Sequence, residues 1–356
     1  MIIIKSKSHD YSVEFFSSFE DTLKALENNR NTFYLVDNNI GRIYKSAFSS
    51  DRHLDKCIFI EASENQKSYE NITPIFLKLL QLGLKRDGVL VVIGGGVTQD
   101  IGCFICSVLF RGISWQLIPT TLLAQADSCI GSKSSINIGA YKNQIGTFYP
   151  PQRVLITSSV LSSLPYDEVR SGLGEIIKLQ LLNNELDFNA LINDLSLISN
   201  SSITSVISKW VMKSLEFKKT YIEEDEFDLG IRNKLNYGHT FGHAYESATS
   251  YRIPHGIAVI LGILTATYLS ARLNLVSYNY YNKLKATLSP WYTPFEKELI
   301  NASREQIFQA IKHDKKNTAG VVNCILTQGS GHMNKTAVNF EEMLKPAVHD
   351  FLDNEI

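Results

Sequence analysis

The first 160 residues alternate short apolar runs with amphipathic stretches. The runs of strand length lie at residues 33–36, 57–60, 89–93, 115–118 and 154–156. Residues 69–84 repeat apolar positions at the spacing of a helix, and an apolar run at residues 1–5 predicts a first strand. Strands that alternate with helices are typical of a parallel sheet with crossover helices. We therefore predict an α/β domain over residues 1–160.

The pattern turns helical after a boundary at residues 158–165. Helices are predicted at residues 101–110, 167–182, 203–221, 239–248, 256–275, 304–313 and 340–352. All but the first of these helices follow the boundary, and one late strand is predicted at residues 320–326. The sequence therefore predicts a second, mainly α-helical domain over residues 161–356.

Composition and charge exclude several classes of function. Apolar residues make up 44% and charged residues 20% of the 356 positions, as in an ordinary soluble globular protein. A formal net charge of -1 gives no reason to expect nucleic acid or an anionic membrane as a partner. Neither a signal peptide nor a spanning helix is predicted, so we expect a cytoplasmic protein. Five cysteines do not suggest a disulfide framework, and Cys103 and Cys106 are interpreted as core residues rather than a redox pair.

Polar residues follow three of the predicted strands, at the edge where open α/β sheets bind ligands. Asp37 and Asn39 follow the first of these strands, and a carboxylate there either meets a ribose hydroxyl or caps a helix. Glu64 and Lys67 follow the next strand. The third group is a glycine run within residues 94–100, where backbone amides could approach a pyrophosphate. The run lacks the usual glycine spacing of dinucleotide-binding sites, so a plain turn is the alternative.

The densest polar segment spans residues 119–133 and continues to Lys142 and Asn143. It contains hydroxyls, the carboxylate of Asp127 and several small residues, again after a strand end. Lysines beside glycine and serine, as at Lys133, suit a phosphate or carboxylate anion. Exposed loop surface is the alternative for both lysines.

A charged pair interrupts the apolar stripe of the helix predicted at residues 167–182. Glu175 and Lys178 stand three residues apart, so they lie on one face of that helix. Buried charges are costly unless they are paired or bound to a ligand. The pair is therefore either a structural ion pair or part of a site.

Three of the eight histidines lie close together in the sequence. His239 and His243 have the spacing that points two imidazoles to one side of a helix, and His255 is expected to open the next helix. Arg232 and Asn236 precede them at similar spacing, so one helical face is expected to carry all four side chains. Metal ligation and a hydrogen-bonded face are both compatible with this spacing.

Together these segments resemble the 3-dehydroquinate synthases and the wider sugar-phosphate cyclases. The resemblance is carried by residues 94–100, 119–133, 142–149, 172–178 and 230–243 with His255, and it spans roughly residues 31–330. It implies an N-terminal Rossmann-like domain and a mainly α-helical C-terminal domain, with an active site between them. It also implies the cofactors NAD and Zn²⁺, with Co²⁺ possible in its place, and a homodimer that acts on a small-molecule sugar phosphate.

The resemblance also implies roles for individual residues. The metal ligands would be Glu175, His239 and His255. This ligand set differs from the pair of His239 and His243 that the helical spacing suggests. Groups around the substrate would be Lys178, Asp127, Lys133, Asn143, Lys218, Asp228, Arg232, Asn236, His243 and Arg111, the last from a partner subunit, with one of Lys315 and Lys316. The NAD site would consist of Asp37, Asn39, Glu64, Lys67, Gly95, Gly96, Val97, Asp100, Thr120, Thr121, Lys133 and Lys142.

The implied activity is that of a phosphate-eliminating lyase of the shikimate pathway, which leads to aromatic amino acids. It would convert 3-deoxy-D-arabino-heptulosonate 7-phosphate to 3-dehydroquinate and phosphate, through hydride transfer to NAD, loss of phosphate, return of hydride and aldol closure. Departures from the usual residues, such as Gln99 and Asp228, bear on substrate identity. A cyclase of secondary metabolism and a metal- and NAD-dependent alcohol dehydrogenase are the alternatives. An inactive binding protein would have lost the charged site residues, which this chain retains.

Overall fold

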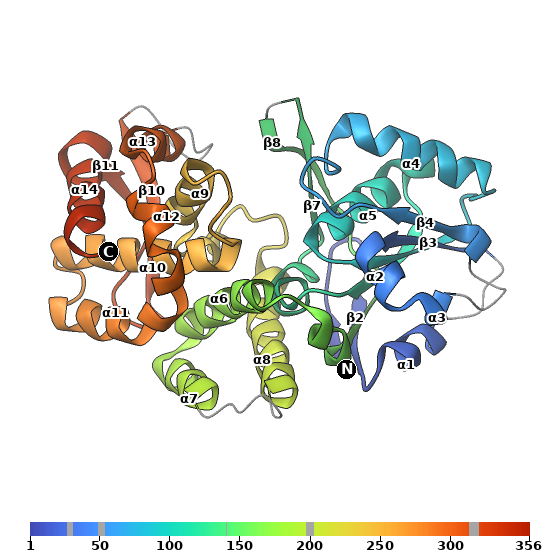
Figure 1. Cartoon of the computed structure of the whole chain (residues 1–356), viewed down its shortest axis with the longest axis horizontal. Coiled ribbons are helices and arrows are strands. Elements are labelled where there is room, and N and C mark those ends of the chain that lie inside the picture. The colour runs from blue at the N-terminus through green and yellow to red at the C-terminus, as the bar shows by residue number, and fades with distance from the viewer. Residues whose placement is uncertain (27–30, 49–53, 140, 197–202, 313–319) are drawn as a thin grey trace. The chain divides into compact units, whose positions relative to one another are not determined.

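The computed structural model describes residues 1–26, 31–48, 54–139, 141–196, 203–312 and 320–356. The chain divides into two compact units (Figure 1). Unit 1 consists of Met1–Pro165 and Asn200–Phe227, and unit 2 consists of Tyr166–Ser199 and Asp228–Ile356. Helix α8 (Ile203–Glu224) therefore belongs to unit 1, although it follows two helices of unit 2 in the sequence.

Unit 1 is built on a seven-stranded sheet with the order β1-β2-β9-β6-β5-β3-β4. Its strands are β1 (Ile2–Ile4), β2 (Tyr11–Phe16), β3 (Thr32–Asp37), β4 (Cys57–Ile60), β5 (Val89–Gly94), β6 (Ser114–Pro119) and β9 (Arg153–Thr157). Every neighbouring pair from β2 to β4 is parallel, and β1 pairs antiparallel with β2. All six residues of β3 are buried, as expected for a parallel strand that is covered on both faces.

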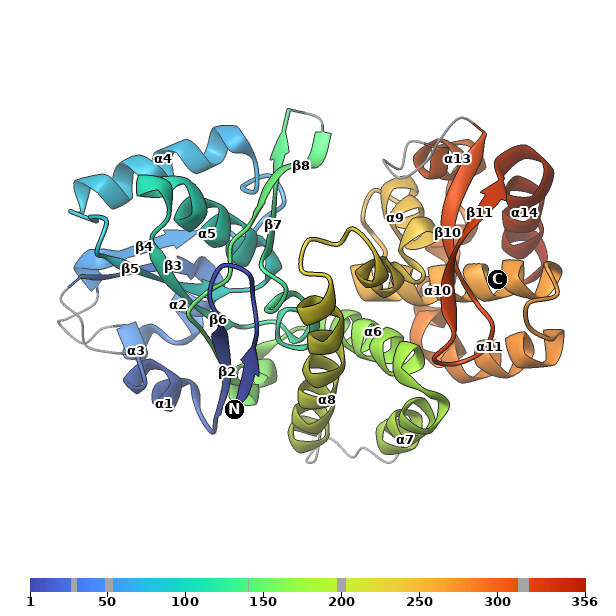
Figure 2. The same cartoon turned by 180° about the vertical axis from the view of Figure 1, so that it is seen from behind.

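The strands predicted in unit 1 are confirmed, whereas three others in its described part were missed. Each apolar run predicted as a strand in residues 1–160 matches β1, β3, β4, β5, β6 or β9. Strand β2 was missed, and so was the hairpin of β7 (Lys133–Ile138) and β8 (Tyr141–Phe148). This hairpin extends away from the sheet (Figure 1, Figure 2), and most of β8 is exposed or half-buried, so it lacks the apolar run that marks a core strand.

Helices complete unit 1 around this sheet. They are α1 (Phe19–Lys24), α2 (Asn38–Ile43), α3 (Lys45–Phe48), α4 (Tyr69–Gln81), α5 (Gly96–Val108) and α8. Strand β5 leads directly into α5, which packs on β5, β6 and the β7 strand of the hairpin. Cys103 and Cys106 lie buried and unbridged in α5, and burial raises the pKa of Cys103 to about 12, so neither is a reactive thiolate.

Unit 2 is mainly helical, which confirms the predicted fold class. Its helices are α6 (Tyr166–Asn183), α7 (Glu185–Ser196), α9 (His239–Ala248), α10 (His255–Arg272), α11 (Tyr278–Tyr292), α12 (Glu296–Ile300), α13 (Arg304–Lys312) and α14 (Lys345–Asn354). A two-stranded antiparallel sheet, β10 (Val321–Thr327) and β11 (Met333–Asn339), completes it. Helices α7, α11 and α12 and strand β11 were not predicted.

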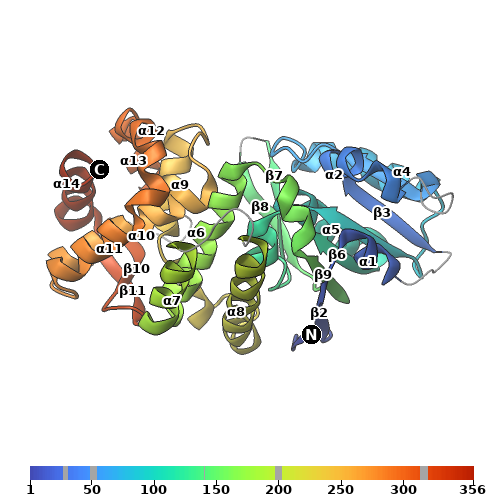
Figure 3. The ribbon, with the colours of Figure 1, turned by 60° about the horizontal axis from the view of Figure 1, so that its bottom comes forward.

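Helix α10 is the core of unit 2. Helices α6, α9, α11 and α14 pack against it (Figure 3), and its residues from Gly256 to Ala271 are all buried. Its length and mean hydropathy would suffice to cross a membrane, contrary to the expectation from the sequence. However, 89% of it is buried by the other helices, as in the central helix of a globular unit.

Helices α6 and α10 cross with their backbones in contact. A Cβ atom on Gly256 would lie 1.8 Å from the carbonyl oxygen of Ser171, and one on Gly174 would lie 2.3 Å from the carbonyl oxygen of Gly256. The Gly256 amide also donates to Ser171 Oγ at 3.0 Å. Only glycines permit this approach, which brings the first turn of α10 against the middle of α6.

We expect the substitution Gly256→Ala to destabilise the protein by about 3 kcal/mol, because a methyl group cannot be accommodated against a backbone carbonyl. Urea unfolding would measure this loss. Gly96→Ala is the control, since a Cβ there meets no atom within 4 Å, and it should change stability by less than about 1 kcal/mol. Equal midpoints for Gly256→Ala and the parent would contradict the crossing.

Candidate functional site

A buried carboxylate forms the centre of a cluster in unit 2. Glu175 lies in the middle of α6 and is only 1% exposed. Its Oε1 atom lies 3.5 Å from His239 Nε2 and 3.2 Å from His255 Nε2, while Oε2 forms an ion pair with Lys178. His239 and His255 are the first residues of α9 and α10. Three helices therefore bring one carboxylate, two imidazoles and one ammonium together.

The four groups set one another's charge. Burial alone would raise the pKa of Glu175, but the charge of Lys178 and the two imidazoles outweigh it and hold that pKa well below its usual range. Burial and the charge of Lys178 hold the pKa of His239 well below its usual range, so this imidazole is neutral. Burial opposes the charge on His255, yet the close carboxylates of Glu175 and Glu246 raise its pKa to about 10.

Both histidines are oriented by their second ring nitrogen. His239 Nδ1 lies 3.3 Å from the carbonyl oxygen of Tyr237, and His255 Nδ1 lies 3.2 Å from Glu246 Oε1. The Nε2 atom of each ring therefore faces Glu175. In metalloproteins, the histidine nitrogen that does not bind the metal is commonly held in this way.

The chemistry of this cluster suits a divalent cation. Ligand atoms of Glu175, His239 and His255 all lie within 4.8 Å of one another. Neither buried oxygen of Glu175 takes part in a hydrogen bond of good geometry among the described residues. Two imidazoles and one carboxylate are a ligand set of catalytic Zn²⁺ sites, which leave a coordination position open. His243, Glu246 and His255 form a second such group, which shares His255 with the first.

The expectation of a single helical face from Arg232 to His243 is wrong. Arg232 and Asn236 lie on a separate 3-10 helix, Ile231–Asn236. Gly238 then adopts a left-handed conformation with φ of 82°, and α9 begins only at the next residue. A Cβ on Gly238 would lie 2.7 Å from the carbonyl oxygen of Val259, so glycine is also required for close packing on α10.

The remaining predicted residues of unit 2 have different surroundings. His243 is exposed, and its ring stacks on that of His255 with a centroid distance of 5.9 Å, so it borders the cluster. Arg232 is buried, while the Asn236 side chain donates to the backbone of Asn233 at 3.1 Å. Asp228 accepts from the Asn233 side chain at 3.3 Å. Lys315 and Lys316 lie outside the described residues.

Unit 1 gathers predicted NAD residues at the carboxyl ends of adjacent strands. Asp37, at the end of β3, caps α2 by accepting from the Asn39 amide at 2.8 Å. The neighbouring strand β5 ends at the glycine run, and β6 ends just before Thr120. The Thr120 amide donates to the Gly94 carbonyl at 3.0 Å. Helix α5 begins at Gly96, and no side chain caps it, so its first amides suit an anion.

A second predicted group forms a hydrogen-bonded network around Lys67. Its buried ammonium donates to Asp100 Oδ2 at 3.1 Å and to Asn143 Oδ1 at 2.9 Å. Burial raises the pKa of Asp100, although the charge of Lys67 opposes this shift. Glu64 lies 3.6 Å from Lys67 and 3.9 Å from Lys142. The loop after β4, helix α5 and the β7–β8 hairpin are thereby linked.

Lys218 and Asp127 form an ion pair within unit 1. Lys218 lies on α8 and is buried, and its Nζ atom lies 2.9 Å from Asp127 Oδ1 and donates to the Asp127 carbonyl at 2.6 Å. Asp127 belongs to a π-helix, Ala124–Ser128, a geometry often found at functional sites. Both residues were predicted from the resemblance, but their pairing was not.

Two predicted residues lie at the surface of unit 1. Lys133 is exposed and stands 5.9 Å over the ring of Phe148. Arg111 is also exposed, and it follows Phe110 in a turn where both residues have positive φ.

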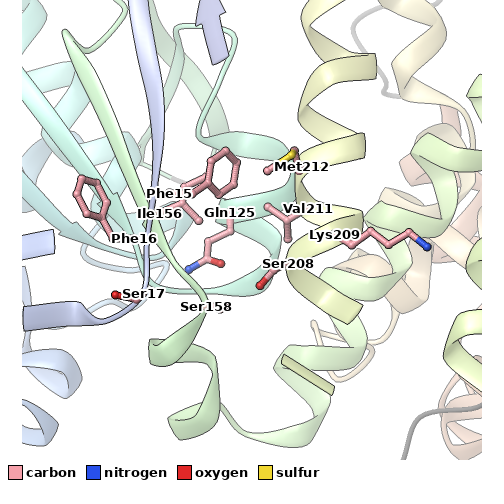
Figure 4. A pocket seen from close by; sticks show the side chains of 10 residues that line it. All are labelled: Phe15, Phe16, Ser17, Gln125, Ile156, Ser158, Ser208, Lys209, Val211 and Met212. Atoms are coloured by element: carbon pink, nitrogen blue, oxygen red, sulfur yellow. The ribbon is translucent and has the colours of Figure 1, made fainter. Parts of the chain in front are cut away.

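A pocket of about 320 Å³ in unit 1 lies apart from the predicted residues. None of them lines it (Figure 4), and its wall is largely apolar, with Phe15, Ile156 and Met212 among its residues. Gln125 also contributes to the wall, and its amide donates to the carbonyls of Pro119 and Thr157. This glutamine therefore links the ends of β6 and β9.

Comparison with known proteins gives the family of the chain. A family model of the 3-dehydroquinate synthase N-terminal region matches residues 57–171, and one of the C-terminal region matches residues 172–317. The chain belongs to the 3-dehydroquinate synthase family. The 3-dehydroquinate synthase of Dictyoglomus thermophilum is 39% identical over 80% of this chain and 79% of its own. That of a Thermoanaerobacter species is 33% identical over 97% of this chain and 98% of its own.

Solved structures extend the likeness of this 3-dehydroquinate synthase family member to related folds. A 2-deoxy-scyllo-inosose synthase complexed with carbaglucose-6-phosphate, NAD+ and Co2+ has a TM-score of 0.85 at 22% identity, over 99% of this chain and 98% of its own. A glycerol dehydrogenase from Schizosaccharomyces pombe has a TM-score of only 0.58 at 15% identity, over 96% of this chain and 88% of its own. Both likenesses concern the fold, which the synthase shares more closely.

Sequence reasoning missed two residues of this family member's cluster. Glu246 follows His239 by seven residues, so it lies two turns further along the same face of α9, and that spacing could have revealed it. The Tyr237 carbonyl contributes through the backbone and has no signal in the sequence. Glu226 was also missed, and it joins the segment after α8 to the loop after β1 by accepting from Ser6 Oγ and the Lys7 amide, each at 2.6 Å.

The Lys218–Asp127 pair predicts a non-additive effect on stability. Lys218→Met should cost about 3 kcal/mol, because it leaves a partly buried carboxylate without its cation. Adding Asp127→Asn should restore part of this loss, with a coupling energy of about 1 to 3 kcal/mol in urea unfolding. Lys219→Met, on the adjacent and more exposed residue, is the control and should cost less than about 1 kcal/mol. Strictly additive losses would contradict the pairing.

Proposed function

We propose that this chain is a 3-dehydroquinate synthase of the shikimate pathway. It would convert 3-deoxy-D-arabino-heptulosonate 7-phosphate to 3-dehydroquinate and phosphate, and so act as a carbon–oxygen lyase. The observation that carries the proposal is the cluster of Glu175, Lys178, His239 and His255 in a chain whose relatives have this name. A cytoplasmic location and a homodimer, with Arg111 reaching a neighbouring site, are proposed on the same family membership.

We propose that the cluster holds Zn²⁺ or Co²⁺ and that the strand ends of unit 1 hold NAD. Glu175, His239 and His255 are the proposed ligands of the cation. The proposed NAD residues are Asp37, Asn39, Glu64, Lys67, Gly95, Gly96, Val97, Asp100, Thr120, Thr121, Lys133 and Lys142. Structural neighbours with NAD+ and with Co2+ or Zn2+ bound support both assignments. When bound, NAD supplies a reversible hydride acceptor and the cation supplies a Lewis acid for a substrate hydroxyl.

The charges of two of the three proposed ligands suit this role, whereas a cation would have to displace a proton from His255. Glu175 is held as a carboxylate and His239 as a neutral imidazole, which are the protonation states that a cation requires of its ligands. Lys178 neutralises Glu175 in the protein alone. A cation that shares the carboxylate's charge would weaken this hold, so that the ammonium could instead bind a substrate oxygen.

Basic and amide side chains would anchor the two anionic ends of the substrate. We assign the substrate carboxylate to Lys133, Lys218 and Arg232, because a guanidinium can bind a carboxylate through two hydrogen bonds. We assign the phosphate to His243, Asn236, Asn143 and Arg111. Asp127 and Lys178 would lie near the substrate hydroxyls, and Asp127 also pairs with Lys218 within unit 1.

The overall conversion involves no net oxidation, so NADH should not accumulate. We expect the protein, supplied with NAD and Zn²⁺, to release phosphate from 3-deoxy-D-arabino-heptulosonate 7-phosphate and to form 3-dehydroquinate. A phosphate assay, NADH absorbance and identification of the carbon product would follow the reaction together. Lasting NADH would instead indicate a dehydrogenase. Phosphate release only from a sugar phosphate that lacks a carboxylate would indicate a cyclase of secondary metabolism.

Removal of the cation should stop the reaction without unfolding the protein. A strong chelator is expected to abolish phosphate release, and Zn²⁺ or Co²⁺ should restore it. Glu175→Gln should weaken Co²⁺ binding by more than about a hundredfold, beyond the loss expected for a residue that does not touch the metal. Glu168→Gln, on an exposed turn of the same helix, is the control and should bind like the parent. Full activity of the chelated protein would rule the metal out.

A further inference from the structure

Glu246 is a buried carboxylate beside the proposed metal ligands, and the proposed function gives it no role. It lies on α9 with only 9% of its surface exposed. Its Oε1 atom lies 3.2 Å from His255 Nδ1, so it faces the ring nitrogen opposite to the one near Glu175. A buried carboxylate is costly unless it is paired, which makes this contact more than an incidental one.

The position of His255 at the start of α10 does not by itself fix the plane of its ring. His255 is the first residue of the helix, and Pro254 before it provides no side-chain hydrogen bond to the helix end. Rotation about the bond to an imidazole ring is soft, so packing or a hydrogen bond must fix the ring plane. The contact from Nδ1 to Glu246 supplies that hydrogen bond and turns Nε2 toward Glu175.

We propose that Glu246 is a positioning residue for metal binding. Its carboxylate accepts the Nδ1 proton of His255, which fixes the ring orientation and the tautomer and leaves the Nε2 lone pair for the cation. This inference rests on the proposed metal site. Helix α9 would then contribute to the metal site in two ways. His239 at its first residue is a proposed ligand, and Glu246 two turns later orients a ligand on another helix.

The second group of donors, His243, Glu246 and His255, offers the opposing possibility that Glu246 binds the metal directly. In that arrangement His255 would have to use Nδ1, the nitrogen that Glu246 faces, and Glu175 would be left out. The geometry favours the positioning role, because His255 Nε2 and His239 Nε2 both converge on the buried oxygen of Glu175. The two arrangements predict different effects of the two glutamates.

The test measures Co²⁺ affinity by competition with a chelator, together with the visible absorption spectrum of bound Co²⁺. Glu246→Gln is expected to weaken binding by about 10- to 100-fold, the usual effect of losing a residue that orients a ligand, and to alter the spectrum. Glu246→Asp keeps the charge and should recover part of the affinity. Unfolding of the metal-free proteins, measured in excess chelator, reports any change in the fold itself.

Asp350→Asn is the matched control. Asp350 also pairs with α10, but at its far end, where Arg272 Nη1 donates to it at 2.7 Å and the Tyr268 hydroxyl donates as well. This variant removes a carboxylate partner from the same helix without touching the cluster. We expect it to bind Co²⁺ with the affinity and spectrum of the parent.

Four results would overturn the proposal. Parental affinity and spectrum for Glu246→Gln would show that the contact has no influence on the metal. An equal loss of affinity in Asp350→Asn would show a general effect of weakening α10. Retention of Co²⁺ by Glu175→Gln with its complete loss in Glu246→Gln would make Glu246 a direct ligand. Failure of the parent to bind Co²⁺ would remove the metal site of the proposed function, and this inference with it.

Discussion

The buried negative charge of Glu175 is the constraint on which unit 2 depends. A carboxylate that is 1% exposed would be strongly destabilising if it stood alone. Lys178 compensates it from within the same helix, while the two histidines must be delivered from other helices. The glycines at the crossing of α6 and α10 allow this delivery, because they let His255 begin its helix beside the carboxylate. The close packing of these two helices is therefore what brings the charged groups of the site together.

The polar residues of unit 1 are stabilised differently from those of unit 2. Its predicted ligand-binding groups lie at the ends of parallel strands, where the backbone leaves the sheet and can expose amides. The charged members are held by one another rather than by apolar packing, as in the network of Lys67, Asp100 and Asn143. Such a network is stable only when each polar group has a hydrogen-bond partner. Because its members lie on the hairpin, α5 and the loop after β4, the network couples these three segments.

The sequence predicts most of the sheet because buried parallel strands are continuous apolar runs, as in β3 and β5. It fails for the β7–β8 hairpin, whose residues are too exposed to leave such a run. It also fails at Gly238, because the periodic pattern continues through a residue whose backbone turns left-handed. Spacing alone paired His239 with His243, and only the family resemblance added Glu175, since proximity between helices has no one-dimensional signature. The contact of Glu246 with His255 is hidden for the same reason.

The assignment of α8 to unit 1 has a consequence for how the protein is encoded. The chain passes between the units at three places, after Pro165, Ser199 and Phe227, so neither unit is a single uninterrupted stretch of the gene. A fragment that ends at Pro165 would contain the whole sheet but would lack Lys218, the cation beside Asp127. A cut after Pro165 or Ser199 would therefore separate Asp127 from Lys218, and a cut after Phe227 would separate Glu175 from His239 and His255.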